Sequence, residues 1–146
     1  MFAVTSYGTG GGQAKIVKSA DGFRAEQRYF LPRFQNHHGG VVLVNDHLYG
    51  TTNTLLLCVN FKTGEQAWGD RSVGKGSVTY ADGHLYVRGE TGRVALVEAD
   101  PAKYVEKGRF DQPDRSEQAA WPHPVVANGK LYLRDWDILL CYDVKK

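Results

Sequence analysis

The sequence lacks several of the features by which a function is usually recognised. None of its apolar runs approaches the roughly 18 residues that a membrane-spanning helix needs. The formal net charge is only +2, and lysine and arginine are scattered singly among the acids instead of forming the basic stripe of a nucleic-acid-binding protein. Residues Met1–Ser6 lack the charged start and long apolar stretch of a signal peptide. We therefore expect no membrane span, no nucleic-acid partner and no signal peptide, and the sequence itself indicates no localisation.

Cysteine is also scarce. Cys58 and Cys141 are the only two, so there is no Cys-x-x-Cys metal motif. Both follow apolar runs, Leu55–Leu57 and Ile138–Leu140, at equivalent positions of a sequence repeat. Because an isolated cysteine usually behaves as a small apolar side chain, we expect both to pack in the core, with a reactive or paired thiol as the alternative.

Motifs of phosphate-binding and hydrolytic sites are missing too. The Gly-rich stretch Gly8–Gly12 lacks the Gly-Lys-Ser/Thr ending of a phosphate-binding loop, and no helical pattern follows it. We expect a flexible hairpin loop over residues 7–12 instead. Neither a Gly-x-Ser-x-Gly elbow nor an evident order of Ser, His and Asp is present. Helical periodicity is weak, whereas 17 glycines suit a fold with many turns.

What the sequence does have is one hairpin pattern that occurs three times. In Ser77–Val87, two β-prone runs flank Asp82-Gly83, a strong signal for a type I′ turn, in which both central residues take positive φ. The same pattern appears over residues 42–49 and 124–132. Its tyrosines stand at positions 49, 86 and 132, which are 37 and 46 residues apart.

This repeat predicts an all-β fold, a β-propeller built from four-stranded antiparallel blades. Four short strands per ~40 residues are typical of a propeller blade, and a meander sandwich is the alternative. We expect one half-propeller domain over residues 1–146, with about four blade units at 2–30, 36–70, 74–112 and 120–146. The first and last units are incomplete, and the expected strands are Phe2–Ser6, Gln13–Lys18, Arg24–Phe30, Gly39–Val44, His47–Thr51, Thr54–Asn60, Glu65–Trp68, Ser77–Ala81, His84–Gly89, Arg93–Ala99, Val105–Phe110, Val125–Val126, Lys130–Arg134 and Ile138–Tyr142.

The run from Cys58 to Trp68 resembles the repeat motif of the pyrroloquinoline-quinone (PQQ)-type propellers, roughly A-x-D-x-x-T-G-x-x-x-W. Thr63, Gly64 and Trp68 match it, whereas Cys58 and Asn60 replace its usual Ala and Asp. The resemblance implies that the Trp68 indole packs on the neighbouring blade and that Thr63-Gly64 sets the third-to-fourth hairpin. Phe110 stands near the Trp position of the next unit, and the last unit ends before it. The chain thus resembles the C-terminal half of such a propeller.

That family includes quinoprotein alcohol dehydrogenases and an outer-membrane assembly lipoprotein, and its members are often exported or periplasmic. The resemblance implies PQQ with Ca²⁺ as the cofactors of the enzymes, held by acidic and amide ligands beside a catalytic Asp and often an adjacent Cys-Cys disulfide. This chain has no adjacent cysteines, and its acids show no spacing of a Ca²⁺ loop. We therefore expect no cofactor, with PQQ and Ca²⁺ as the alternative.

A homodimer follows from the number of blades. Propellers close with four to eight blades, and four units in an open arc would expose the apolar faces of the first and last. Two copies meeting head to tail would close a ring of eight. A closed four-bladed monomer and a natural chain cut in half are the alternatives.

The candidate site lies in the segments that lead into the innermost strands, residues 35–40, 74–77 and 121–124, which in a propeller surround one mouth of the central channel. Imidazoles there could bind a transition metal or an anionic ligand; the alternative is that these are polar groups satisfied within loops. Neighbouring residues of an extended strand point to opposite faces, so we expect only one of the two adjacent histidines to face the channel. The predicted ligand-binding residues are His37, His38, Lys75, Trp121 and His123.

Three other side chains are expected at the surface. His47 and His84 follow hairpin turns and should face solvent, and Trp136 should be an exposed contact residue on a turn.

Three classes of function remain open at this point. A non-catalytic binding or scaffold module, with no catalytic residue, is the expected one. A quinone-dependent oxidoreductase fragment and a hydrolase or lyase that uses the channel histidines are the alternatives.

Overall fold

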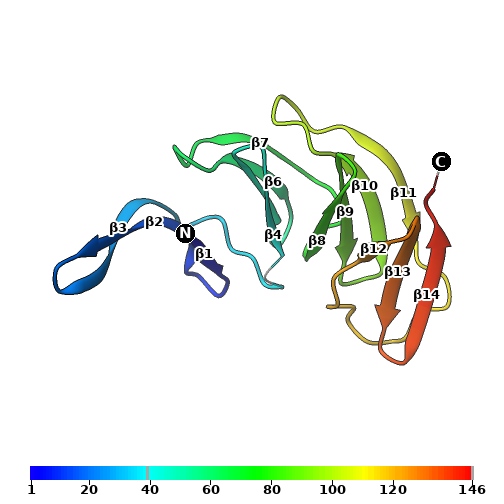
Figure 1. The fold of residues 1–146 in the computed structure, drawn as a ribbon. Coiled ribbons are helices and arrows are strands. Elements are labelled where there is room, and N and C mark those ends of the chain that lie inside the picture. The colour runs from blue at the N-terminus through cyan, green and yellow to red at the C-terminus, as the bar shows by residue number, and fades with distance from the viewer. Residues whose placement is uncertain (39, 146) are drawn as a thin grey trace.

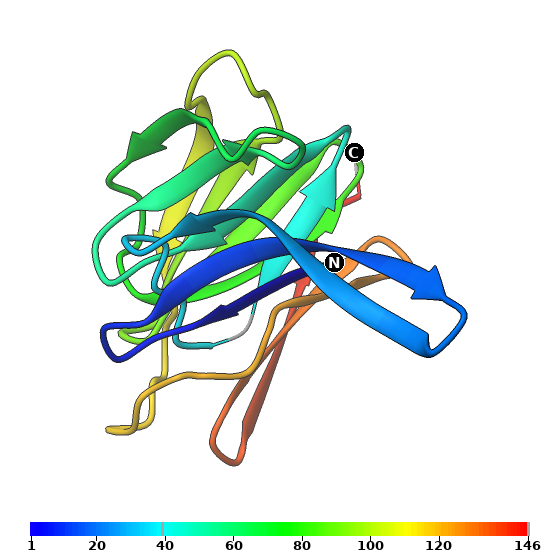
Figure 2. The same ribbon diagram turned by 90° about the vertical axis from the view of Figure 1, so that its left-hand side faces the viewer.

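The chain folds into four antiparallel sheets that follow one another along an open arc (Figure 1). The structure is a computed structural model that describes residues 1–38 and 40–145. These residues contain 14 strands and no helix, so the fold is all-β as the repeat predicts. It follows that the described residues hold no helix capable of crossing a membrane. The β2–β3 hairpin of the first sheet projects away from the other sheets (Figure 1, Figure 2).

Each sheet is a meander in which neighbouring strands are also consecutive in sequence. The four sheets contain three, four, four and three strands, which is the predicted number for each unit. In sheet order the strands are β1 (Phe2–Thr5), β2 (Gly10–Ser19) and β3 (Gly22–Leu31); β4 (Val41–Val44), β5 (His47–Thr51), β6 (Leu56–Asn60) and β7 (Gln66–Asp70); β8 (Gly76–Ala81), β9 (His84–Gly89), β10 (Arg93–Glu98) and β11 (Glu106–Asp111); β12 (Val125–Ala127), β13 (Lys130–Asp135) and β14 (Ile138–Asp143).

The three predicted hairpin turns have the expected backbone. Both central residues have positive φ in each: 45° and 62° at Asn45-Asp46, 48° and 77° at Asp82-Gly83, and 52° and 73° at Asn128-Gly129. This is the type I′ pattern, which matches the twist of the strands that it joins.

The Gly-rich stretch differs from the prediction of a loop over residues 7–12. Gly10–Gly12 begin β2, so only residues 6–9 connect it to β1. The glycines are needed for close packing in the sheet, because a Cβ at Gly11 would lie 2.8 Å from the Phe2 ring and 3.1 Å from Val4 Cγ2. The predicted start of the next sheet, Gly39, lies outside the described residues.

Apolar side chains fill the space between successive sheets. Sheets one and two enclose Phe34 and Leu48, with Phe2 packed against them. The largest cluster joins sheets two and three, and a smaller one joins sheets three and four. Because alternate residues of a strand face opposite sides of a sheet, the two middle sheets contribute to the cores on both of their faces.

The two cysteines have different environments. Cys58 is buried in the largest core cluster, as predicted, and burial raises the pKa of its thiol to about 11. The prediction of core packing is wrong for Cys141, which is exposed on β14. The reason is that the described residues form no fifth sheet over the outer face of the last one, so Cys141 and its neighbour on that face, Leu139, point outward.

Each of the first three sheets places one aromatic ring of its last strand on the following sheet. Tyr29 donates its hydroxyl to the Phe61 carbonyl at 2.9 Å. Phe110 packs on Tyr142, with ring centroids 5.1 Å apart. Trp68 holds the equivalent place between sheets two and three. The aromatic contact therefore recurs along the arc, although only one of the three residues is a tryptophan.

The partly buried indole of Trp68 lies between Tyr49 of its own sheet and Tyr104 of the next. The ring centroids are 5.9 Å and 5.7 Å away. Its Nε1 donates to the Asp100 carbonyl at 2.8 Å. Trp68 thus packs on the neighbouring sheet through its indole, as the motif resemblance implies.

The Thr-Gly turn that precedes Trp68 is held by Asn60. Its Oδ1 accepts hydrogen bonds from the backbone amides of Lys62 and Thr63, at 2.9 Å and 3.1 Å. An asparagine keeps the acceptor that the usual aspartate of the motif supplies. Gly64 has a φ of 79°, and the Tyr29 ring covers it so closely that a Cβ would lie 2.7 Å away. The turn therefore requires glycine at this position.

Replacing Trp68 should lower the free energy of unfolding. We expect a loss of about 3 kcal/mol for Trp68→Ala, at the low end for such truncations because the ring is only partly buried. Trp68→Phe should lose about 1 kcal/mol, mainly from the missing hydrogen bond. Urea unfolding would measure both. Trp136→Ala, in an exposed indole, serves as the matched control, and a Trp68→Ala variant as stable as this control would contradict the inter-sheet role.

Candidate functional site

The segments that lead into β4, β8 and β12 meet because these three strands lie next to one another on the inner side of the arc. Side chains tie the sheets together there. Thr51 donates its hydroxyl to the Gly76 carbonyl at the start of β8. Thr79 of β8 donates to the Pro124 carbonyl, just before β12, at 2.6 Å. The beginnings of the inner strands are therefore held side by side.

Three of the predicted site residues converge there on one carboxylate oxygen. Glu90 Oε1 accepts a hydrogen bond from Trp121 Nε1 at 2.9 Å and lies 3.1 Å from Lys75 Nζ. The same oxygen lies 3.1 Å from His38 Nε2. The His38 imidazole also stacks on the Trp121 indole, with centroids 6.2 Å apart and planes at 29°. We call His38, Lys75, Glu90 and Trp121 the mouth cluster.

The other two predicted residues lie beside the mouth cluster without reaching Glu90. The His37 ring packs near that of His38, 6.2 Å between centroids, and meets Tyr7 edge-on at 5.0 Å. His123 places Nε2 3.0 Å from the His38 carbonyl and covers Gly40, where a Cβ would lie 2.7 Å from the imidazole. All five predicted residues are thus brought to one place, and ligand binding by them stays a prediction.

Glu90 is the residue that the sequence analysis missed. It lies in the turn between β9 and β10, outside the segments that lead into inner strands. The hairpin register contained a signal for it. The pairing of Gly76 with Gly89 continues to Lys75 and Glu90, where the Glu90 amide bonds to the Lys75 carbonyl at 2.9 Å. Opposite charges at facing positions of two strands are a stabilising pair.

The mouth cluster holds one positive and one negative charge around a neutral imidazole. Burial alone would raise the pKa of Glu90, but the hydrogen bonds from Lys75 and Trp121 outweigh it and lower the pKa. Burial lowers the pKa of His38 despite the attraction of Glu90. The His38 side chain is 10% exposed, and its Nε2 is buried without forming a hydrogen bond. The nearest charged group to this atom is the Glu90 carboxylate, 3.1 Å away.

The possible metal ligands around the histidines bear on this site, because a transition metal is one of the ligands that the sequence leaves open. No three His, Cys, Asp or Glu side chains among residues 1–38 and 40–145 are grouped so as to hold a metal ion. His123 turns Nε2 toward a backbone carbonyl, as described above. PQQ and Ca²⁺ stay a prediction of the resemblance alone.

The histidines that follow the hairpin turns, His47 and His84, are partly exposed, so the prediction that they face solvent holds only in part. His47 Nδ1 lies 2.9 Å from the Asn45 carbonyl, and His84 Nδ1 lies 2.8 Å from the Asp82 carbonyl. Each ring folds back on its own turn, because a carbonyl two residues earlier is within reach of Nδ1.

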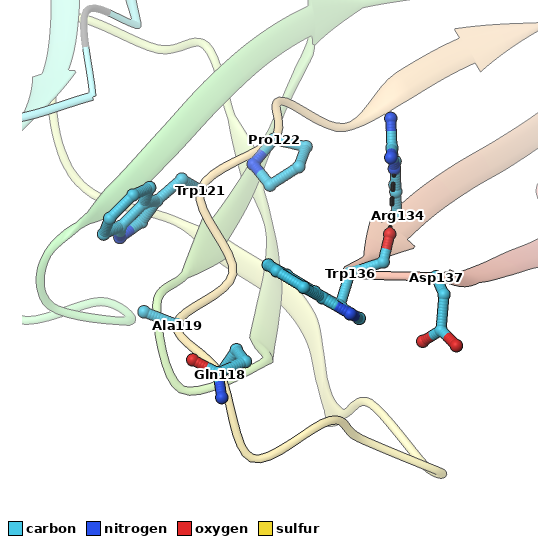
Figure 3. A pocket seen from close by; sticks show the side chains of 7 residues that line it. All are labelled: Gln118, Ala119, Trp121, Pro122, Arg134, Trp136 and Asp137. Atoms are coloured by element: carbon cyan, nitrogen blue, oxygen red, sulfur yellow. Dashed lines mark hydrogen bonds between the residues drawn. The ribbon is translucent and has the colours of Figure 1, made fainter.

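A pocket of about 680 Å³ adjoins the mouth cluster (Figure 3). Trp121 is common to both. The indole of Trp136 is exposed, as predicted, and borders the same pocket from the β13–β14 turn. We call this the tryptophan pocket, and its lining residues are Gln118, Ala119, Trp121, Pro122, Arg134, Trp136 and Asp137.

Comparisons with known proteins leave the family open. No protein-family model and no curated protein matches this chain. Among solved structures, the crystal structure of Myxococcus xanthus glutaminyl cyclase is similar at 19% sequence identity with a TM-score of 0.49. The match covers 83% of this chain and 56% of the cyclase, so this chain corresponds to little more than half of that protein. At that level of similarity no residue or activity of the cyclase is carried over.

The lowered pKa of His38 predicts a pH dependence of stability. In the unfolded chain His38 has an ordinary histidine pKa of about 6.5, so as the pH falls it binds a proton at a higher pH than it does in the folded chain. The free energy of unfolding should therefore fall as the pH drops below that value, until the folded His38 is protonated as well. Urea unfolding at pH 7.5 and pH 5.5 would measure the change. A His38→Gln variant should lose less stability over this interval, and an equal loss in both proteins would show that other groups cause it.

Proposed function

We propose that the protein is a non-catalytic binding module that holds a small polar ligand at the mouth cluster. The observation that carries this proposal is the convergence of His38, Lys75 and Trp121, from the approaches to three sheets, on one oxygen of Glu90. The buried Nε2 of His38 faces Glu90 Oε1 at 3.1 Å without the geometry of a hydrogen bond, and it supplies a hydrogen-bonding atom for the ligand. Unpaired buried polar groups are costly, so a partner for this atom would stabilise the site.

The surrounding hydroxyl groups favour binding over hydrolysis. Ser77 and Thr79, at the start of β8, donate to the carbonyls of Pro122 and Pro124, at 3.4 Å and 2.6 Å. A nucleophilic hydroxyl needs a hydrogen bond to a base, whereas these two groups join neighbouring sheets.

A ligand screen tests the proposal. Ligand-observed NMR with a metabolite library of organic acids, amino acids and nucleosides should yield binders of the full chain. His38→Gln and Lys75→Gln should weaken each binder about tenfold or more, the loss expected when a central contact is removed. Lys62→Gln is the matched control, because Lys62 pairs with Asp46 in an exposed ion pair away from the site. A library without binders, or binders that all variants retain, would contradict the proposal.

The finer architecture is part of the proposal. The sheets are blades of a PQQ-type propeller, as the residues Thr63, Gly64 and Trp68 suggest, and two chains close an eight-bladed ring. Large apolar side chains at both ends of the arc support this closure: Phe23 of the first sheet is 76% exposed and Leu139 of the last is 67% exposed. Covering such groups favours association.

The dimer predicts a mass near twice that of the 16.2 kDa chain. Light scattering coupled to size exclusion would measure it. The double variant Phe23→Lys/Leu139→Lys should be monomeric, because lysines would replace apolar contacts at both ends with charges. A stable wild-type monomer at about the mass of one chain would rule the closure out and leave the ligand proposal to its own test.

A further inference from the structure

We propose that the tryptophan pocket binds a neutral carbohydrate, with a sugar ring stacked on the exposed indole of Trp136. This goes beyond the ligand site at the mouth cluster, with which the pocket shares only Trp121. The inference combines four features of the pocket: its two exposed indoles, the backbone of its turn, the buried network that fixes its walls, and its balance of charge.

Two indoles are exposed on a single pocket. Trp136 is 70% exposed and Trp121 is 61% exposed. Single exposed apolar residues are common and need no functional explanation. Two exposed tryptophans that line one concave site of about 680 Å³, in contrast, indicate a binding site. That volume lies within the range of small-molecule sites. Figure 3 shows the two indoles on either side of the hollow, one before β12 and one on the β13–β14 turn.

The backbone at Trp136 is of a kind rarely adopted by a bulky side chain. Asp135 pairs with Ile138, so Trp136 and Asp137 form a two-residue turn. Of these two, only Trp136 has a positive φ, 56°. Glycine, asparagine or aspartate is the usual residue there, and the other three two-residue hairpins with positive φ use such residues. A strained and exposed tryptophan is therefore best explained by a role in binding.

Both walls of the pocket are fixed from behind by Asp135. Its buried carboxylate accepts hydrogen bonds from the Ser116 hydroxyl, from Gln112 Nε2 at 2.8 Å and from Arg115 Nε at 3.3 Å. Arg115 also donates to the Gln118 carbonyl at 2.7 Å. The segment that carries Trp121 and the turn that carries Trp136 are thus joined. A rigid site binds with a smaller loss of conformational freedom.

The polar groups of the pocket suit a neutral ligand rich in hydroxyls. Arg134 donates through Nε to the Trp136 carbonyl at 3.0 Å. In the part of the chain that the structure describes, the terminal nitrogens of Arg134, the Asp137 carboxylate and the side-chain amide of Gln118 make no hydrogen bond within the protein. One positive and one negative group give no net charge, which disfavours both anionic and cationic ligands. Sugar hydroxyls both donate and accept, as these three groups require.

The apolar face of a sugar ring would be recognised by stacking on an indole. The axial C–H face of a pyranose is flat and apolar, and the exposed face of an indole offers a matching apolar surface. A carbohydrate therefore uses both kinds of surface that the pocket presents, the aromatic faces and the charged rim.

The test uses the full-length chain and neutral oligosaccharides of glucose, xylose, mannose and N-acetylglucosamine. Saturation-transfer NMR and tryptophan fluorescence titration would measure binding. At least one series should bind, and Trp136→Ala should weaken it about tenfold or more. Asp137→Asn should weaken it too, because the charge is lost and one of the two acceptor oxygens is replaced by a donor nitrogen. Tyr80→Ala, which truncates a partly exposed aromatic ring elsewhere, is the matched control and should bind like the wild type.

The outcomes separate this inference from the proposed function. His38→Gln should leave sugar binding intact while it weakens the ligand of the mouth cluster, and Trp136→Ala should do the reverse. The carbohydrate proposal is overturned if none of the oligosaccharides binds, if Trp136→Ala binds them as well as Tyr80→Ala does, or if single-stranded oligonucleotides or cationic peptides bind in their place. A thermal melt of Trp136→Ala like that of the wild type would confirm that lost binding is not lost folding.

Discussion

The third and fourth sheets depend on the burial of one guanidinium group. Arg88 is fully buried on β9 and donates to the Arg134 carbonyl and to the Gln112 side chain. Gln112 in turn bonds to Asp135, which is also fully buried. Burial alone would raise the pKa of Asp135, but hydrogen bonds from Ser116, Arg115 and Gln112 outweigh it and lower the pKa. Because a buried charged group is costly unless it is hydrogen-bonded, the bonds of Arg88 to the Arg134 carbonyl and to Gln112 hold the third and fourth sheets in one arrangement.

The fold was predictable because it is encoded locally. A two-residue turn of Asn, Asp or Gly residues, Asn45-Asp46 before β5 and Asp82-Gly83 before β9, fixes the register of the strands beside it, so that β5 and β9 have the bounds expected from sequence. The errors come from packing between sheets. Whether Gly10–Gly12 form a loop or a strand depends on the rings of Phe2 and Phe30 that lie against them. Cys141 is exposed because no other described residues form a sheet over the outer face of the last one.

The candidate site was predictable only in part, for the same reason. The place of His38, Lys75 and Trp121 at the beginnings of inner strands follows from the repeat. Glu90 could have been found by counting outward from the Asp82-Gly83 turn, because the hairpin register places it opposite Lys75, which has the opposite charge. The tryptophan pocket could not, because Asp135 and the groups that converge on it bring Trp136 and the Trp121 segment together. These contacts join residues that no local pattern relates.

Trp121 links the two sites and limits what each can do. Its indole N–H is committed to Glu90, so the ring presents its apolar surface, not a donor, to the tryptophan pocket. Within the mouth cluster the charges of Lys75 and Glu90 neutralise each other, whereas the polar groups of the tryptophan pocket lack partners in the described chain. A ligand at the mouth must therefore fit around the contacts already made among Lys75, Glu90 and Trp121, and of this cluster His38 Nε2 is left to bond it. A ligand in the tryptophan pocket meets several groups that have no hydrogen bond in the described chain.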